Sequence, residues 1–279
     1  LGERMKEYEE YSQDINEIEP NDAFLIRLDG KSFSKMTSGL DRPDELFSQA
    51  MLMTTKDLMN ETHAVTAFVN SDEISLLFKP QETENATHMY GGRVFKLIST
   101  IAGYASTRFS TNFINLLKKS TDNKHAKYLN KCYSNNELNL KFHFDARLVY
   151  AENKHYEYLN YILWRQNDCA RNYISTLAEK YFSKSSLKNV STSKRIEMIQ
   201  NKYKDFKFVP HLQYGWLIKR SIVNVVHRGN NCDRHILEAK SVSFKVTNNT
   251  TKLFLNKNWF DCNDDLTIIE TKIDKKVEQ

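Results

Sequence analysis

Apolar and polar positions in the first half of the chain follow two periods, one typical of helices and one of strands. Apolar residues recur with a helical period in two segments, which predicts helices from Glu45 to about Leu58 and from about Gly92 to Leu117. Short apolar or alternating runs predict strands at about 23–29, 65–70, 74–79 and 142–150. The resulting order β-α-β-β-α-β is that of the ferredoxin-like split unit. We therefore expect an α+β fold of palm type, with an antiparallel sheet and both helices on one face.

The second half of the chain has a less regular pattern. A long helix is predicted at about 155–182, and its polar middle, Trp164 to Cys169, suggests that this part faces a cleft. A shorter helix is expected at about 193–204. The other elements that we expect are an exposed helix at 3–17, strands at 214–218, 221–226, 241–246 and 252–256, a loop at 118–141 and a charged tail from Lys272.

The length of 279 residues allows one large domain or two small ones. We divide the chain into a palm-like catalytic domain at 1–150 and a mostly helical and short-strand extension at 151–279 that packs on it. No run approaches the roughly 18 apolar residues of a membrane span, so we expect no membrane partner.

Four widely spaced cysteines form no CxxC pair, which argues against a zinc site or a disulfide framework and for a reducing compartment. We expect a cytoplasmic protein, or a mitochondrial one if an N-terminal segment has been trimmed.

Acidic residues stand at two positions where predicted strands end. Asp29 and Gly30 follow the apolar run from Phe24, and Asp72 and Glu73 lie between two strands of a hairpin. Neighbouring strands can bring these carboxylates together at one edge of a sheet. Carboxylate ligands without histidine or cysteine suit Mg²⁺ rather than zinc. The alternative is that both positions are ordinary turns with solvated acids.

The net charge of +5 is too mild to indicate a nucleic-acid partner by itself. Two segments concentrate the charge, because 118–131 has five lysines and one acid, and 184–195 has four basic residues and no acid. Such segments can follow a phosphate backbone, and the alternative is two solvated loops in a chain rich in lysine and asparagine.

Four sequence blocks resemble the tRNA(His) guanylyltransferase superfamily and occur in that family's order. They are Ile26–Phe33, Asn70–Ser75, Phe144–Arg147 and Leu163–Cys169. The resemblance implies a palm-like catalytic domain, two Mg²⁺ ions, ATP or GTP as activating nucleotide, nucleoside triphosphate substrates, tRNA or a tRNA-like RNA as partner, and a homotetramer. It also implies extension of RNA in the 3′-to-5′ direction, with the C-terminal extension contributing to RNA binding.

The resemblance carries residue roles only at matching positions. It implies that Asp29 and Asp72 are the metal carboxylates, that the Gly30 carbonyl is a further ligand, and that Glu73 belongs to the catalytic group. The nucleotide-binding set that it implies is Gly30, Lys31, Ser32, Phe33, Ser34, Arg42, Ser71, Asp72, Arg93, Lys96 and Asp168. The expected RNA-binding set is Lys118, Lys119, Lys124, Lys127 and Arg165.

Two departures from the family pattern bear on the substrate. The family's His-Ile-Asn-Asn-Leu-Tyr-Asn run after the Asp-Cys pair is replaced by Ala170–Thr176, in which only Asn172 keeps its place, and the glycine of Phe-Asp-Gly-Arg is Ala146. These changes favour the guanylyltransferase-like branch, which repairs truncated tRNA 5′ ends by template-dependent addition, over tRNA(His) G(−1) addition.

Two other functions stay open. A palm-type nucleotide cyclase would share the strand–acid geometry, but the Trp-Arg-Gln-x-Asp-Cys block argues against it. A non-catalytic RNA-binding protein on the same fold would have no use for both acids and Gly30.

Overall fold

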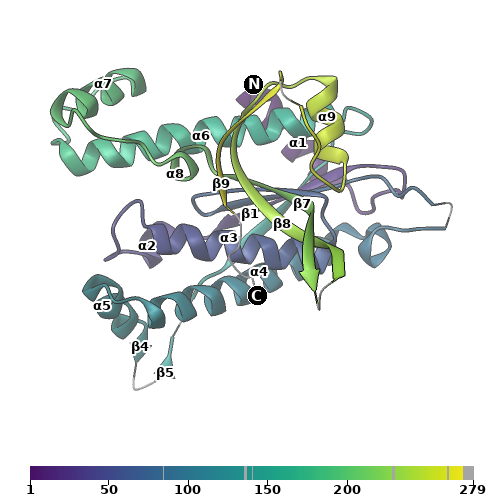
Figure 1. Cartoon of the computed structure of the whole chain (residues 1–279), viewed down its shortest axis with the longest axis horizontal. Coiled ribbons are helices and arrows are strands. Elements are labelled where there is room, and N and C mark those ends of the chain that lie inside the picture. The colour runs from purple at the N-terminus through teal and green to yellow at the C-terminus, as the bar shows by residue number, and fades with distance from the viewer. Residues whose placement is uncertain (84, 135–136, 140, 228–229, 263, 273–279) are drawn as a thin grey trace.

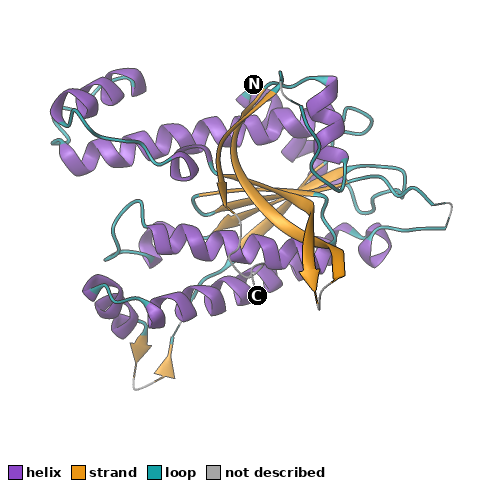
Figure 2. Ribbon diagram, in the orientation of Figure 1, coloured by secondary structure: helices purple, strands orange, loops and turns teal. Residues whose placement is uncertain are grey.

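The computed structural model describes the whole chain except residues 84, 135–136, 140, 228–229, 263 and 273–279. A seven-stranded antiparallel sheet with the order β6-β1-β3-β2-β7-β8-β9 forms its centre. Its strands are β1 (Phe24–Gly30), β2 (Thr66–Asn70), β3 (Glu73–Phe78), β6 (Phe144–Val149), β7 (Trp216–His227), β8 (Asn230–Phe244) and β9 (Leu266–Lys272). Helices cover both faces of this sheet, so the molecule has three layers (Figure 2).

The helices and minor strands complete the described chain. They are α1 (Gly2–Tyr11), η1 (Ser12–Asp14), α2 (Phe33–Met36), α3 (Glu45–Thr62), η2 (Met89–Gly92), α4 (Val94–Lys119), α5 (Asn123–Lys131), α6 (Tyr156–Tyr181), α7 (Thr192–Lys202), α8 (Pro210–Tyr214), α9 (Asn248–Leu255), β4 (Tyr133–Ser134) and β5 (Glu137–Leu138). None of these helices is both long and apolar enough to cross a membrane.

The alternation of side chains along β1 explains the two outer layers. Phe24, Ile26 and Leu28 belong to the core under α3 and α4, whereas Leu25 belongs to the core under α1, α6 and α9. Arg27 and Asp29 follow Leu25 at a spacing of two residues, so they face the α6 layer as well. This period places Asp29 on the face of the sheet that α6 covers.

The predicted palm is confirmed, since β1, α3, β2, β3, α4 and β6 follow in the expected order and both helices share one face. The second half adds to the same sheet, because β7 pairs with β2 from Val69 opposite Trp216 onward. The sheet therefore continues across the predicted boundary at residue 150. The predicted short strands are wrong for β7 and β8, which have 12 and 15 residues.

Other predicted elements also need correction. The strand predicted at 252–256 is helix α9, which begins with a capping box between Thr247 and Thr250. Strand β9 was not predicted, and all but the first residue of the predicted charged tail lies outside the described residues. Part of the predicted loop at 118–141 is helix α5, capped by the side chain of Asp122.

The C-terminal half of α6 continues beyond the sheet and forms a small core with α7. This core includes Tyr173, Leu177, Leu187 and Ile199. The segment from Lys180 to Lys207, called the α7 arm below, lies on the same side of the molecule as α2 and α5 (Figure 1). The arm and α5 therefore project from the end of the sheet at which β1 terminates.

Candidate active site

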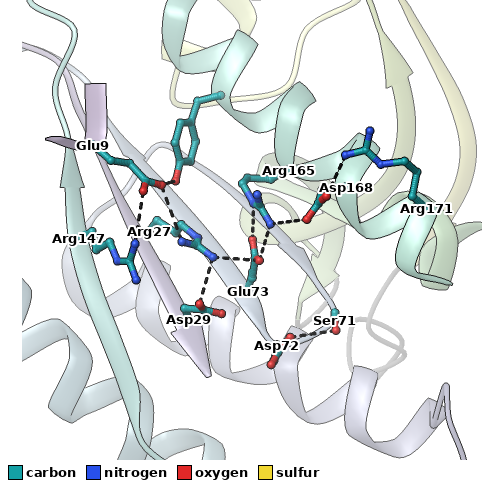
Figure 3. A network of polar contacts seen from close by, with 11 residues as sticks. Glu9, Arg27, Asp29, Ser71, Asp72, Glu73, Arg147, Arg165, Asp168 and Arg171 are labelled. Atoms are coloured by element: carbon teal, nitrogen blue, oxygen red, sulfur yellow. Dashed lines mark hydrogen bonds and ion pairs between the residues drawn. The ribbon is translucent and has the colours of Figure 1, made fainter. Parts of the chain in front are cut away.

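A main-chain hydrogen bond brings the two predicted metal acids to one edge of the sheet. The N–H of Gly30, at the end of β1, donates to the carbonyl oxygen of Asp72 at 3.0 Å. Asp72 lies in the two-residue turn between β2 and β3, in which Ser71 has a left-handed φ of 54°. The Ser71 hydroxyl donates to the Asp72 carboxylate at 3.0 Å. Figure 3 shows Asp29 and Asp72 at the ends of neighbouring strands.

Asp29 also stands in a row of acids that crosses three strands. It pairs with Glu73 of β3 on one side and with Asp145 of β6 on the other. Burial raises the pKa of Asp29 to about 6, and the charges of Glu73, Asp72 and Asp145 add to this effect against the opposing charge of Arg27. Burial also raises the pKa of Asp72. Negative charge therefore accumulates here in a way that a bound cation would relieve.

The donor atoms at this edge fit a hard divalent cation. Asp29 and Asp72 offer carboxylate oxygens, and the Gly30 backbone adjoins both, which matches the oxygen ligands that Mg²⁺ prefers. No cluster of three or more acidic, histidine or cysteine side chains with metal-binding geometry occurs among the described residues. A metal ion here would therefore complete its coordination with main-chain oxygen, triphosphate oxygens and water.

Glu73 has a different environment from its neighbour Asp72. Arg165 of α6 binds it through Nε at 2.6 Å, and Arg27 of β1 binds it at 3.0 Å (Figure 3). Its charge is thus compensated by two arginines, which makes it a residue that positions β1, β3 and α6 rather than a free catalytic acid. Arg165, predicted to bind RNA, is only 7% exposed and is used in this cluster, so that prediction is wrong.

Arg27 is a site residue that the sequence analysis missed. It also donates to the Asp29 carboxylate at 3.1 Å, so it contacts two of the three acids of the row, Asp29 and Glu73. The signal in the sequence was an arginine in the middle of an otherwise apolar strand. A charged side chain in such a strand is rarely buried without partners.

Asp168 lies beside this cluster and not in the cavity described next. Its carboxylate accepts from Arg165 and Arg171, both at 2.9 Å. These bonds lower its pKa although burial acts in the opposite direction. Asp168 lines a separate open groove of about 850 Å³ that is also bordered by α1. Its predicted contact with a nucleotide stays a prediction.

A cavity of about 260 Å³ adjoins Asp72 on the other side. Its walls come from α2, the segment 37–44 between α2 and α3 (the α2–α3 loop), the start of α3, the β2–β3 turn and α6. The lining residues used below are Ser34, Asp41, Arg42, Asp44, Phe47, Ser48, Ser71, Asp72, Cys169, Asn172, Tyr173 and Thr176. Four residues of the predicted nucleotide set outside the metal acids therefore line one cavity, namely Phe33, Ser34, Arg42 and Ser71. The Arg42 guanidinium donates to the Ser34 carbonyl oxygen.

The start of α2 is held in place by Phe33. Its ring is 2% exposed and packs among aromatic side chains such as Phe109 at 5.1 Å and Phe144 at 4.9 Å. A Cβ atom at Gly30 would lie 2.6 Å from this ring, which explains the glycine there. Phe33 also borders the cavity. Ser32 occupies the N-cap position of α2 with a left-handed φ of 59°, and the Lys31 side chain is exposed. The ring of Phe33 thus serves the core, so Phe33 can meet a phosphate only through its backbone.

Comparison with known proteins agrees with this geometry. The family model of tRNAHis guanylyltransferase matches residues 2–152. An uncharacterized protein of Acanthamoeba polyphaga mimivirus is 36% identical over 281 residues, covering 94% of this chain and 90% of that protein. The chain belongs to the tRNAHis guanylyltransferase family. Members of this family are nucleotidyltransferases that act on tRNA.

Solved structures of the family share the fold. A bacterial tRNA(His) guanylyltransferase-like protein in complex with ATP has a TM-score of 0.59 and 22% identity, with 84% of this chain and 91% of that chain covered. The Saccharomyces cerevisiae tRNA(His) guanylyltransferase has a TM-score of 0.53 and 20% identity, with 80% and 93% covered. The palm-like architecture is therefore that of tRNA(His) guanylyltransferases.

Arg93 and Lys96 do not lie in this site. The segment before α4 adjoins the chain that precedes β1, since Ile18 N–H donates to the Gly92 carbonyl at 3.0 Å and Val94 N–H to the Asn16 carbonyl at 2.9 Å. Asp29 lies at the other end of β1, about 20 Å away at the usual rise per residue. Neither residue therefore lies beside Asp29 and Asp72 of its own chain, and their predicted contact with a nucleotide stays a prediction.

The predicted RNA-binding lysines lie close to the cavity but are not equivalent. Lys118 and Lys119 end α4, and Lys127 is exposed on α5. Lys124 is already bound to Asp41 of the cavity wall at 2.7 Å. The prediction of a free phosphate-binding lysine does not apply to Lys124 in this structure.

Proposed function

We propose that this family member is a template-dependent 3′-5′ nucleotidyltransferase that adds nucleotides to the 5′ end of tRNA after ATP- or GTP-dependent activation of the 5′-phosphate. The main support for this proposal is that Asp29 and Asp72 lie at the ends of neighbouring strands, both with a raised pKa, next to a cavity that Asp72 lines. Acids that keep a costly charge at a cavity are typical of functional sites.

Two Mg²⁺ ions would be held by Asp29, Asp72 and the Gly30 carbonyl. Such ions, when bound, supply charge neutralisation for a triphosphate and activation of the attacking oxygen. The protein's own groups would orient the nucleotide. Arg42 and the backbone at the start of α2 lie where phosphates would be held, and Phe47 and Tyr173 offer aromatic surface to a base. Bacterial relatives solved in complex with ATP and with GTP support nucleotide binding by this family member.

The RNA would approach between two basic segments that flank the cavity. The α7 arm has eight basic and two acidic residues, a net charge of +6, which exceeds the +5 of the whole chain. The segment 118–131 adds five lysines against one acid. Lysines concentrated in this way release counterions from a phosphate backbone and so favour binding to RNA. A homotetramer and a cytoplasmic or mitochondrial location stay predictions.

The choice of 5′-end repair over tRNA(His) G(−1) addition rests on where the departures from the family pattern fall. Two of the altered positions after Cys169, Tyr173 and Thr176, line the cavity beside Asn172, which keeps its place in the family pattern. A changed wall beside the nucleotide is expected to change which nucleotide or RNA end is accepted. This observation favours the repair activity over the G(−1) alternative.

The deciding experiment supplies tRNA transcripts that lack the first 5′ nucleotide and carry a 5′-monophosphate, with ATP, Mg²⁺ and all four nucleoside triphosphates. The opposing 3′-strand base is varied through all four identities. We expect the added nucleotide to follow the opposing base. Addition of guanosine irrespective of that base, and only to tRNA(His), would establish the G(−1) alternative, and a cyclic product from GTP alone would establish a cyclase.

A further inference from the structure

Helix α5 lies along the end of α2 and the α2–α3 loop, and polar contacts join it to them at three places. The Tyr128 hydroxyl donates to the Met36 carbonyl at 2.8 Å, Lys124 pairs with Asp41 at 2.7 Å, and His125 Nε2 pairs with Asp44 at 3.0 Å. In addition, the Lys131 ammonium lies 3.4 Å from where a Cβ of Gly39 would be. One face of a nine-residue helix thus follows the loop over its full length.

This loop is one wall of the cavity beside Asp72. Asp41, Arg42 and Asp44 all line it, so the contacts of Lys124 and His125 both end at residues of the cavity wall. The hydrogen bond from Lys124 lowers the pKa of Asp41, and Lys180 of the α7 arm acts in the same direction. Two cations thus offset a carboxylate that would otherwise repel a triphosphate in the cavity.

His125 has the most direct connection to the cavity. Asp44 uses one carboxylate oxygen for His125 and the other to accept the Phe47 N–H at 2.8 Å, which caps the start of α3. Phe47 and Ser48, in the first turn of α3, line the cavity. The side chains of His125 and Asp44 are 13% and 9% exposed, so water competes little for their bond. The orientation of His125 is therefore transmitted through Asp44 to the cavity wall.

The other ring nitrogen of His125 fixes the imidazole. Nδ1 is hydrogen-bonded to the Ser120 hydroxyl at 2.7 Å, and this oxygen also accepts the Asp122 N–H at 3.2 Å. The spatial arrangement of Ser120, His125 and Asp44 resembles the catalytic triad of a hydrolase. However, Ser120 lines neither the cavity beside Asp72 nor the groove at Asp168, and it serves the junction of α4 and α5. The arrangement therefore orients His125 and does not make a nucleophile.

We propose that His125 is a positioning residue for nucleotide binding that acts through Asp44, and that Lys124 supports it through Asp41. The inference rests on the proposed function only in taking the cavity as the nucleotide site. It assigns α5 a role beyond RNA contact, because the helix that carries Lys127 toward solvent also holds the wall of the nucleotide cavity.

The test compares ATP binding and steady-state kinetics of the full chain and its variants in Mg²⁺. Loss of one hydrogen bond to a charged partner predicts that His125→Ala raises the ATP Kd, and KM by the same factor, about tenfold, with kcat at saturation within about twofold. His125→Gln keeps an N–H donor near the Nε2 position and is expected to recover most of the affinity. Asn130→Ala, on the exposed side of the same helix, is the matched control and is expected to bind ATP like the unmodified protein.

Each other outcome has a defined meaning. A lower Tm with unchanged Kd would show that His125 serves only stability. A fall in kcat with unchanged KM would show that His125 does not act through nucleotide binding. Either result would overturn the inference. If His125→Ala does not fold, His125→Gln and Lys124→Met decide, with a Kd for ATP about twofold higher expected for Lys124→Met because its exposed ion pair is weak. Failure of the unmodified protein to bind ATP would overturn the proposed function too, whereas ATP binding that is indifferent to all three variants would overturn this inference alone.

Discussion

Two clusters of carboxylates in the described part of the chain differ in how far neighbouring cationic groups compensate their charge. At the site, Asp29 and Asp72 keep raised pKa values, although Arg27 is close to Asp29. Where the C-terminal strand meets the palm, His211 lies between Glu45 of α3 at 2.8 Å and Glu270 of β9 at 3.0 Å. Its ring stacks on Trp216 at 4.8 Å. The difference indicates that the fold pairs its charges where it joins elements and leaves them partly unpaired where a cation is expected.

The largest effect should come from removing a site carboxylate. Asp29→Ala or Asp72→Ala is expected to reduce incorporation of labelled nucleotide by about a thousandfold or more, because phosphoryl transfer depends on the metal ions that these acids would hold. The far-UV circular dichroism spectrum should match that of the unmodified protein. Near-normal incorporation by either variant would show that the replaced carboxylate is not needed for nucleotide transfer.

The adjacent acid should behave differently. Glu73→Gln leaves Arg27 and Arg165 without their shared partner in a buried cluster, and we expect a loss of about 3 kcal/mol in the free energy of unfolding. Asp72→Asn should lose far less stability in the same urea titration. Equal losses for the two variants would show that neighbouring acids do not have the distinct roles that the structure gives them.

The stabilisation by the cluster of His211, Glu45 and Glu270 should depend on pH. Burial lowers the pKa of His211, but its hydrogen bonds to Glu45 and Glu270 outweigh this and raise the pKa above its usual value of 6.5. The resulting stabilisation is complete below that usual value and is lost as pH rises through the raised one. His211→Gln should therefore cost about 1 kcal/mol at pH 6, since both glutamates are partly solvated, and little at pH 9. A loss independent of pH would contradict this account.

The smallest effect should be a gain in stability. The pKa of Asp29 is raised to about 6 against an ordinary value of 3.8, so the folded state is penalised above pH 6 and not below the ordinary value. Asp29→Asn is expected to raise Tm by about 2 °C at pH 7.5 without metal, and the difference should vanish near pH 4. Thermal unfolding of the two proteins in chelator would check this, and a less stable variant at pH 7.5 would refute the sign.

Sequence patterns predicted the palm well because its elements have clear periods. Asp29, Asp72 and Gly30 could be found because each lies at the end of an apolar run. Arg165 could not be assigned correctly, since its polar neighbours on α6 suggested a cleft while its partner Glu73 is 92 positions away. The position of Arg93 and Lys96 could not be foreseen for a similar reason, because a local match does not show at which end of the sheet a helix begins. Helix α5 was missed because lysine and asparagine obscure the buried positions of Tyr128 and Cys132.

We expect Asp29 and Asp72 together to hold divalent ions beside a triphosphate. Binding of Mn²⁺, a paramagnetic substitute for Mg²⁺, in the presence of a non-hydrolysable ATP analogue measures it most directly by electron paramagnetic resonance. We predict saturable binding of two ions by the unmodified protein and by a folded Glu73→Gln variant, and loss of at least one of them in Asp29→Asn and in Asp72→Asn. Equal Mn²⁺ binding by the unmodified protein and both aspartate variants would contradict the account.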